Sequence, residues 1–190
     1  MKPINHFIVH IPKKFQDEIK FNGGKIEIIS KYNEFEYRVN SGEIISVPKG
    51  FDEDCIGSTM YFHHHVVIEQ RYDIGENLYL VQYEADGGYG NHAVAIEDED
   101  GDITMLGDWC FVLPPVEPKE EKSSSGIILS IKEKPELEGI LFAIHKDSEW
   151  IGVKTGDIVG YTENSEYKMD LKNATVYRMR SKELVYVKEA

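Results

Sequence analysis

The sequence predicts an all-β chain, and three observations support this. Short runs of β-branched and aromatic residues recur at close spacing, for example at residues 7–11 and 78–81, as is typical of strands. Proline ends some of these runs, as at Pro12 and Pro48, because it donates no backbone hydrogen bond to a ladder. No stretch keeps a helical period over about a dozen residues. Many short strands with frequent turns indicate barrels or sandwiches.

The strands expected in the first half of the chain follow in order. They are residues 7–11, 42–47, 59–62, 78–81 and 93–96. Residues 13–24 are expected to form a polar connection that ends in the turn signal Asn22-Gly23-Gly24, and a further strand is expected from Ile26. The acidic residues 97–102 have the composition of a solvated hairpin tip.

Composition and charge limit the possible functions. Hydrophobic residues make up 41% of the chain and charged residues 29%, so a folded core is expected. The net charge of −13 argues against a nucleic-acid partner, because a phosphate backbone repels such a surface. Cys55 and Cys110 have no metal-type spacing and are expected to be small buried residues in a reducing compartment. Without a membrane-length apolar run or a signal-peptide pattern, we expect a soluble cytoplasmic protein that contacts no membrane.

The strand pattern starts again near residue 103, which indicates an internal repeat. Residues 5–10 correspond to residues 108–113, and proline follows each run. Residues 56–62 correspond in the same way to residues 155–161. The intervening glycine landmark, Gly42 or Gly139, lies 15 residues before Gly57 in the first copy and 17 before Gly156 in the second. We therefore expect a tandem duplication with domains at residues 1–102 and 103–190.

A polar segment in the second copy ends in three adjacent aliphatic residues, Ile127, Ile128 and Leu129. Serine and glycine keep such a segment mobile, and a solvated loop exposes three branched side chains at a cost unless something covers them. One interpretation is that the triplet begins a core strand, which the segment taken alone favours. The other is that the triplet docks into the groove of a partner.

The second copy resembles the GroES-type co-chaperonins, which cap the chaperonin folding cage. The resemblance depends on the order of five features: the strand led by Asp108, the Ser-Gly-Ile-Ile-Leu loop at 125–129, the strand at Gly139, the turn and strand at 153–159, and the closing run at 183–190. The first copy keeps the same order, so the whole chain resembles a double-barrel form with two tandem GroES-like irregular β-barrels. Its divergent residues 61–67 are similar to those of bacteriophage-encoded versions.

The resemblance implies how such a protein would work. The first and last strands of each barrel would lie at edges and pair with neighbouring copies to close a homo-oligomeric ring, expected to be a heptamer. The chaperonin-binding residues would be Gly126, Ile127, Ile128 and Leu129, with the glycine supplying the turn before the triplet. The partner would be a GroEL-like chaperonin of host or phage origin, and unfolded client proteins would benefit indirectly. The resemblance implies no bound cofactor and no nucleotide on this chain.

The first copy has Gly23, Gly24, Ile26 and Ile28 at the place of the second copy's loop. Charged residues interrupt the apolar ones there, and the alternation suits a strand with one buried face better than a docking segment. We therefore expect the second barrel to contact the chaperonin and the first to form a distal layer.

His63, His64 and His65 invite a metal interpretation. In a strand, His63 and His65 would share a face, and such a pair can ligate a metal. The sequence offers no evident third ligand, so we expect no metal site. The histidines would instead line a barrel or ring surface, where protonation near pH 6 would affect assembly.

The remaining patterns are weak as functional signals. The acidic residues 97–102 lack the spacing of an EF-hand loop, and the glycine-rich residues 86–90 lack that of a phosphate-binding loop. Trp109 and Trp150 are expected to be core and interface anchors rather than a carbohydrate-binding surface. No catalytic arrangement can be defended, so we expect a non-enzyme. The alternative function is a viral structural or accessory protein that uses the barrel as an interaction module without chaperonin contact; a barrel enzyme ranks third.

Overall fold

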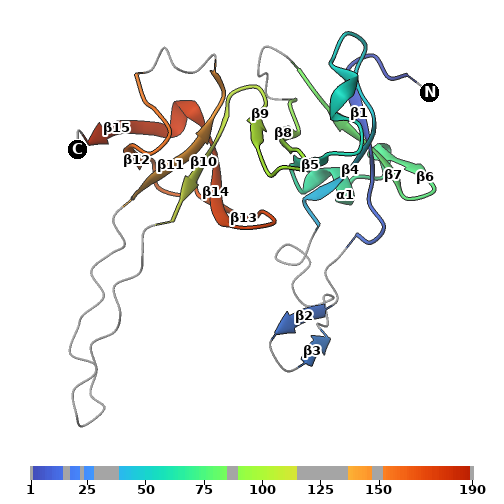
Figure 1. Cartoon of the computed structure of the whole chain (residues 1–190), viewed down its shortest axis with the longest axis horizontal. Helices are drawn as coiled ribbons and strands as arrows, with labels where there is room; N and C mark the ends of the chain where they lie inside the picture. The colour runs from blue at the N-terminus through green and yellow to red at the C-terminus, as the bar shows by residue number, and fades with distance from the viewer. Residues whose placement is uncertain are drawn as a thin grey trace. The chain divides into compact units, whose positions relative to one another are not determined.

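A computed structural model describes residues 2–14, 18–21, 24–27, 39–84, 90–114, 137–146 and 152–188. The chain is all-β, which confirms the predicted fold class, and it divides into two compact units, Met1–Gly107 and Asp108–Ala190 (Figure 1). The sequence places the division between residues 102 and 103. In the structure, β9 (Ile103–Met105) pairs with β8 (Ala93–Glu97) and therefore belongs to the first unit.

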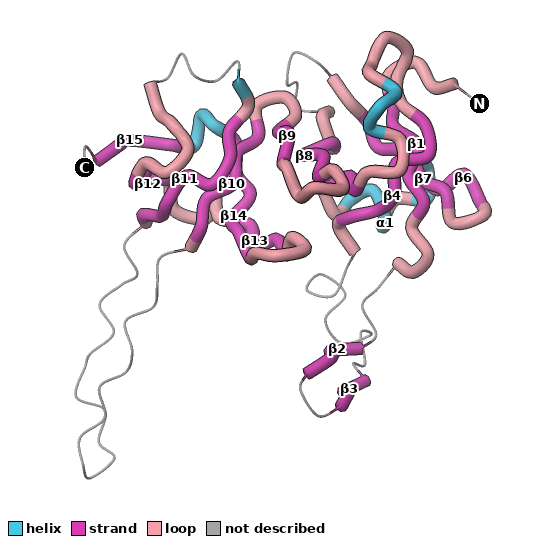
Figure 2. Tube along the Cα trace, viewed as in Figure 1, coloured by secondary structure: helices cyan, strands magenta, loops and turns pink. Residues whose placement is uncertain are grey.

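The first unit is built on one seven-stranded antiparallel sheet in the order β6-β7-β1-β4-β5-β8-β9. The remaining strands of this sheet are β1 (His6–His10), β4 (Ser41–Ser46), β5 (Thr59–Phe62), β6 (Asp73–Gly75) and β7 (Leu78–Gln82). Its short helical turns are η2 (Glu53–Cys55), α1 (His65–Ile68) and η3 (Gln70–Tyr72). A separate hairpin of β2 (Glu18–Phe21) and β3 (Gly24–Glu27) lies in the connection from β1 to β4 (Figure 2).

The second unit is built on a six-stranded antiparallel sheet in the order β13-β14-β10-β11-β12-β15. Its strands are β10 (Trp109–Leu113), β11 (Glu138–Ile144), β12 (Ile158–Tyr161), β13 (Tyr167–Asp170), β14 (Thr175–Arg180) and β15 (Leu184–Lys188). The short turn η5 (Ser181–Glu183) joins β14 to β15.

The two sheets have the same topology. Strands β10 to β15 of the second unit occupy, in chain order, the same sheet positions as β1, β4, β5, β6, β7 and β8 of the first. Among the described strands, β9 is the one addition to the first sheet. The ladder irregularities match as well: one lies between Ile8 and Val9 in the first unit and between Phe111 and Val112 in the second. Because bulges are specific features of a sheet and not random defects, their coincidence at aligned positions supports a duplication.

A shared glycine turn strengthens this correspondence. The Gly57 amide donates to the Ile44 carbonyl at 2.9 Å, and the Gly156 amide donates to the Leu141 carbonyl at 2.7 Å. The two glycines have φ angles of +93° and +97°, a region that glycine enters without steric cost. The same turn therefore leads into β5 and β12.

Both first strands lie inside their sheets, which corrects the expectation that they lie at edges. Strand β1 pairs with β4 and β7, and β10 pairs with β11 and β14. The reason is their composition: four of the five side chains of β10 are buried, and a buried strand needs hydrogen-bond partners on both sides. The last strand of each unit matches the expectation, because β9 and β15 each end the order of their sheet.

The expected polar connection over residues 13–24 contains a strand and is wrong in that respect. Residues 18–21 pair with residues 24–27, with Ile19 opposite Ile26 and Phe21 opposite Gly24. The sequence between them is Asn22-Gly23, the dipeptide that most strongly favours a two-residue hairpin. The glycine-containing sequence that was expected to end a polar connection therefore joins the two strands of a hairpin.

Each unit has its own apolar core. In the first unit the core includes Phe7, Val9, Ile44 and Phe62, and Phe7 packs edge-to-face on Phe51 at a centroid distance of 4.9 Å. The core of the second unit includes the following residues: Cys110, Val112, Leu141, Val159 and Met179. Among the helices that the structure describes, none has the length and apolar character needed to cross a bilayer.

The two cysteines are free and differ in burial, which gives a test of the second core. Cys110 is fully buried, as expected, whereas Cys55 is only half-buried. Desolvation raises the pKa of both thiols, most strongly for Cys110, where Glu183 and Asp108 add to the effect. Because the thiolate is the reactive form, we expect native protein at pH 8 to alkylate Cys55 at least about tenfold faster than Cys110. Peptide mapping after timed iodoacetamide treatment measures both rates, and equal rates in native protein would contradict the burial of Cys110.

Candidate functional site

The apolar triplet and its turn, Gly126 to Leu129, lie outside the described residues, as do Gly23 and Ile28 of the first copy. Gly24 and Ile26 lie in β3, which agrees with the expectation that this segment forms a strand. What the structure describes is the framework that carries the two candidate loops.

Strands β10 and β11 carry the second loop. They are antiparallel neighbours, with Leu113 opposite Ile140 and Val112 opposite Leu141 (Figure 1). The chain therefore leaves the sheet after Leu113 and returns at Glu138 beside its point of departure, so the ends of the connection are held together. In the first unit, β1 and β4 hold the ends of the β2–β3 connection in the same way, with His10 opposite Glu43.

A glycine stands at the base of each connection because the two strands approach too closely for a side chain. A Cβ atom on Gly139 would lie 2.5 Å from Val112 Cγ1 and would also clash with the Leu113 carbonyl oxygen. A Cβ on Gly42 would lie 2.8 Å from the His10 carbonyl oxygen. Close backbone approach is a common reason for glycine within a strand. The repeat that the sequence marks with Gly42 and Gly139 therefore has a steric basis.

Strand β15 presents the other candidate surface. Among the described strands it pairs with β12 alone, and Val185, Tyr186 and Val187 are 62%, 47% and 39% exposed. Its counterpart in the first unit, β8, is covered on the corresponding side by β9. An apolar edge strand with open backbone groups is a template for pairing with another chain. The second unit therefore exposes an edge that the first unit covers with its own chain.

Side chains fix β15 to its sheet on the side of β12. The Tyr186 ring lies over Gly160, where a Cβ atom would overlap the ring. The Tyr186 hydroxyl donates to the Glu138 carboxylate, and Lys188 Nζ donates to the same carboxylate at 2.7 Å. These contacts hold the edge strand in place while its other side stays open.

An arginine–aromatic stack in the second unit was not evident from the sequence. The buried guanidinium of Arg178 lies 4.6 Å from the Trp109 ring centroid and 4.4 Å from that of Tyr167. Burial lowers the pKa of Arg178 to about 10, so the group stays charged at neutral pH. Arg180 lies 3.5 Å from the Trp109 ring centroid and pairs with Asp108. The sequence signal that could have indicated this stack is the alternation of Arg178 and Arg180 with Tyr177 and Met179 along one strand.

This stack bears on the proposed roles of the tryptophans. Trp109 is only 6% exposed, which agrees with its expected place as a core anchor and leaves no free ring face for a sugar. Trp150 lies outside the described residues.

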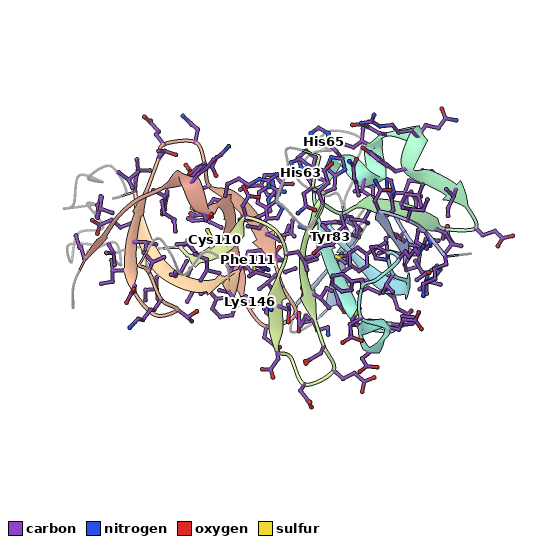
Figure 3. All side chains as sticks on the ribbon, turned by 90° about the horizontal axis from the view of Figure 1, so that it is seen from above. His63, His65, Tyr83, Cys110, Phe111 and Lys146 are labelled. Atoms are coloured by element: carbon purple, nitrogen blue, oxygen red, sulfur yellow. The ribbon has the colours of Figure 1, made fainter. Side chains whose placement is uncertain are left out.

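The three histidines lie in a turn, and this changes the geometry assumed from the sequence. Strand β5 ends at Phe62, and α1 begins at His65. The rings of His63 and His65 stack at a centroid distance of 4.5 Å (Figure 3). His64 stacks on both, at 4.4 Å from His63 and 4.6 Å from His65.

No protein-family model and no curated protein matches this chain. The functional conclusion therefore depends on the repeat, on the placement of the loop and on the open edge.

The close approach at Gly139 predicts that an added methyl group will disturb the β10–β11 pair. We expect Gly139→Ala to destabilise the second unit by about 1–3 kcal/mol, the usual cost of overpacking. Ile140→Ala is the matched control, since Ile140 is the exposed neighbour on the same strand, and it should cost less than about 1 kcal/mol. Both tryptophans lie in the second unit, so urea unfolding followed by tryptophan fluorescence reports on that unit. Equal stability of Gly139→Ala and the parent chain would contradict the steric account.

Proposed function

We propose that this chain is a double-barrel co-chaperonin, an oligomeric lid that caps a chaperonin folding chamber and so assists the folding of client proteins. The observation that carries the proposal is the position of the apolar triplet. Residues 127–129 lie in the connection between β10 and β11, whose ends the ladder and Gly139 hold together. A docking segment tethered at both ends to a rigid sheet is what a lid requires.

The energetics of such a segment favour weak single contacts. Burial of three aliphatic side chains contributes roughly 5–8 kcal/mol before costs. Ordering six to eight loop residues costs about 1–2 kcal/mol for each residue, a total of the same size. One loop therefore binds weakly, and a ring that presents many loops binds tightly because each later contact is intramolecular. Such a lid can hold the chamber and still leave it.

The open edge of β15 supports assembly into a ring of identical chains, for which we propose seven copies. An incoming strand would satisfy the backbone groups of β15 and cover Val185 and Val187. The β2–β3 hairpin supports a division of labour between the units. Because residues 24–27 already pair with residues 18–21, we assign the chaperonin contact to the second unit and a distal layer to the first.

The proposed lid needs no catalytic group, cofactor or nucleotide of its own, since the chaperonin supplies the nucleotide-driven cycle. It would act in the cytoplasm, and in the host cytoplasm if a phage encodes it. A chain that forms rings but binds no chaperonin would instead fit the accessory interaction module.

A charge within the triplet tests the docking role. We expect Ile128→Asp to weaken binding to a GroEL-type chaperonin with ATP at least about a hundredfold, because every loop of the ring loses its apolar contact at once. Ser124→Asp places the same charge in the same segment outside the triplet and should retain binding. Light scattering of the mixture measures the complex, and circular dichroism checks the fold of both variants. An unfolded Ile128→Asp chain would show that the triplet is core and would overturn the proposal.

A charge on the open edge tests ring assembly separately. We expect Val185→Lys to raise the concentration at which the oligomer half-dissociates at least about tenfold, because lysine on an edge strand discourages pairing. Ile4→Lys, at an exposed position outside the strands, is the control. Size-exclusion chromatography with light scattering gives the masses. A parent chain that is monomeric throughout the micromolar range would contradict the assembly through β15.

A further inference from the structure

The turn after β5 gathers three imidazoles that a strand would have separated. In an extended strand His64 would point away from His63 and His65. Here His64 has helical backbone angles, φ −55° and ψ −20°, and His65 is the first residue of α1. The potential ligand atoms of His63, His64 and His65 consequently lie within 4.8 Å of one another.

Backbone hydrogen bonds hold this turn in place. The His63 amide donates to the His92 carbonyl at 2.9 Å, which ties the turn to the start of β8. The carbonyls of His63, His64 and His65 accept from the amides of Val66, Val67 and Glu69 at 3.0, 3.3 and 3.1 Å. Val66 and Val67 are buried in the core of the first unit, so packing as well as hydrogen bonding fixes the base of the cluster.

The sheet itself does not require this segment. Between β12 and β13 the second unit makes the same connection with residues 162–166, whereas the first unit uses residues 63–72 between β5 and β6. The longer connection brings α1 and the three histidines, and the topology of the sheet is unchanged. The cluster is therefore an addition to the common fold.

We propose that His63, His64 and His65 bind one Zn²⁺ ion, each through one ring nitrogen. Imidazole is a preferred ligand of zinc, with Zn–N distances of about 2.0–2.1 Å. Tetrahedral binding needs nitrogen atoms about 3.4 Å apart, and the ligand atoms here already lie within 4.8 Å of one another. The rings are stacked, so binding requires them to rotate about their side-chain torsions until each ring plane contains the ion. Binding through His63 Nδ1 would replace the long 3.3 Å hydrogen bond from the His65 amide. Three protein ligands leave a fourth position for water or for a group from another molecule.

The charges on this segment do not oppose a cation. The neighbouring Arg71 pairs with Glu69 at 2.6 Å, so its charge is balanced on the same segment. The chain as a whole carries a net charge of −13. The expectation of no metal site rested on the lack of a third ligand, and the turn supplies that ligand as His64.

The test uses the full-length chain without a polyhistidine tag. Isothermal titration with Zn²⁺ should give one equivalent per chain, and Co²⁺ should give the visible absorption of a four- or five-coordinate nitrogen site. We expect His64→Ala and His65→Ala each to weaken Zn²⁺ binding at least about tenfold. His10→Ala, a histidine of the same unit outside the cluster, should bind as the parent chain does.

A second measurement keeps the test decisive if a variant misfolds. Zn²⁺ should protect His63, His64 and His65 of the parent chain from diethyl pyrocarbonate, as read by mass spectrometry, and should leave His10 reactive. Unprotected cluster histidines, or Zn²⁺ affinity that survives the His64 and His65 substitutions, would overturn the proposal.

Discussion

Backbone hydrogen bonds on both sides of one strand hold each unit together. Strands β1 and β10 pair with two neighbours each, and the buried side chains along them bring the rest of the sheet into register. Strands β4 and β11, which pair with β1 and β10, run so close to them that only glycine fits, at Gly42 and at Gly139. This constraint fixes both ends of the connection that leaves each central strand. Whatever that connection carries is presented from the same place on the sheet, and the proposed docking role of residues 127–129 depends on it.

The sequence predicted the strands that carry runs of apolar residues, because burial imposes composition directly. The runs at 7–11, 42–47, 59–62, 78–81 and 93–96 all correspond to strands. The sequence did not predict β9, because pairing with a neighbouring strand and not composition decides this structure. Strand β9 has three residues and forms because the turn at Asp98 and Gly101 folds it back on β8. The acidic residues 97–102 form the hairpin tip that their composition predicts, but this tip joins β8 to β9 and does not end the first unit. The strand geometry expected for the three histidines was wrong for a related reason, since no local signal showed that β5 stops at Phe62 and that the chain turns before His65.

The two copies of the sheet have diverged in complementary ways. The first covers the edge of β8 with β9, carries a paired hairpin in its long connection and adds the histidine turn after β5. The second leaves the edge of β15 open and carries the apolar triplet in the corresponding connection. The first unit thus covers with β9 the edge that the second unit leaves open at β15. A lid needs contacts both with its own copies and with the chamber, and in this account the second unit provides both.

Hydrogen–deuterium exchange of the full-length chain, alone and with a GroEL-type chaperonin and ATP, tests the central claim most directly. The account predicts that exchange slows in the peptides that cover residues 123–131 when the chaperonin binds, while exchange in the β2–β3 hairpin stays unchanged. Equal exchange of residues 123–131 in the two conditions, under concentrations at which a complex would form, would contradict the assignment of a docking segment to the β10–β11 connection.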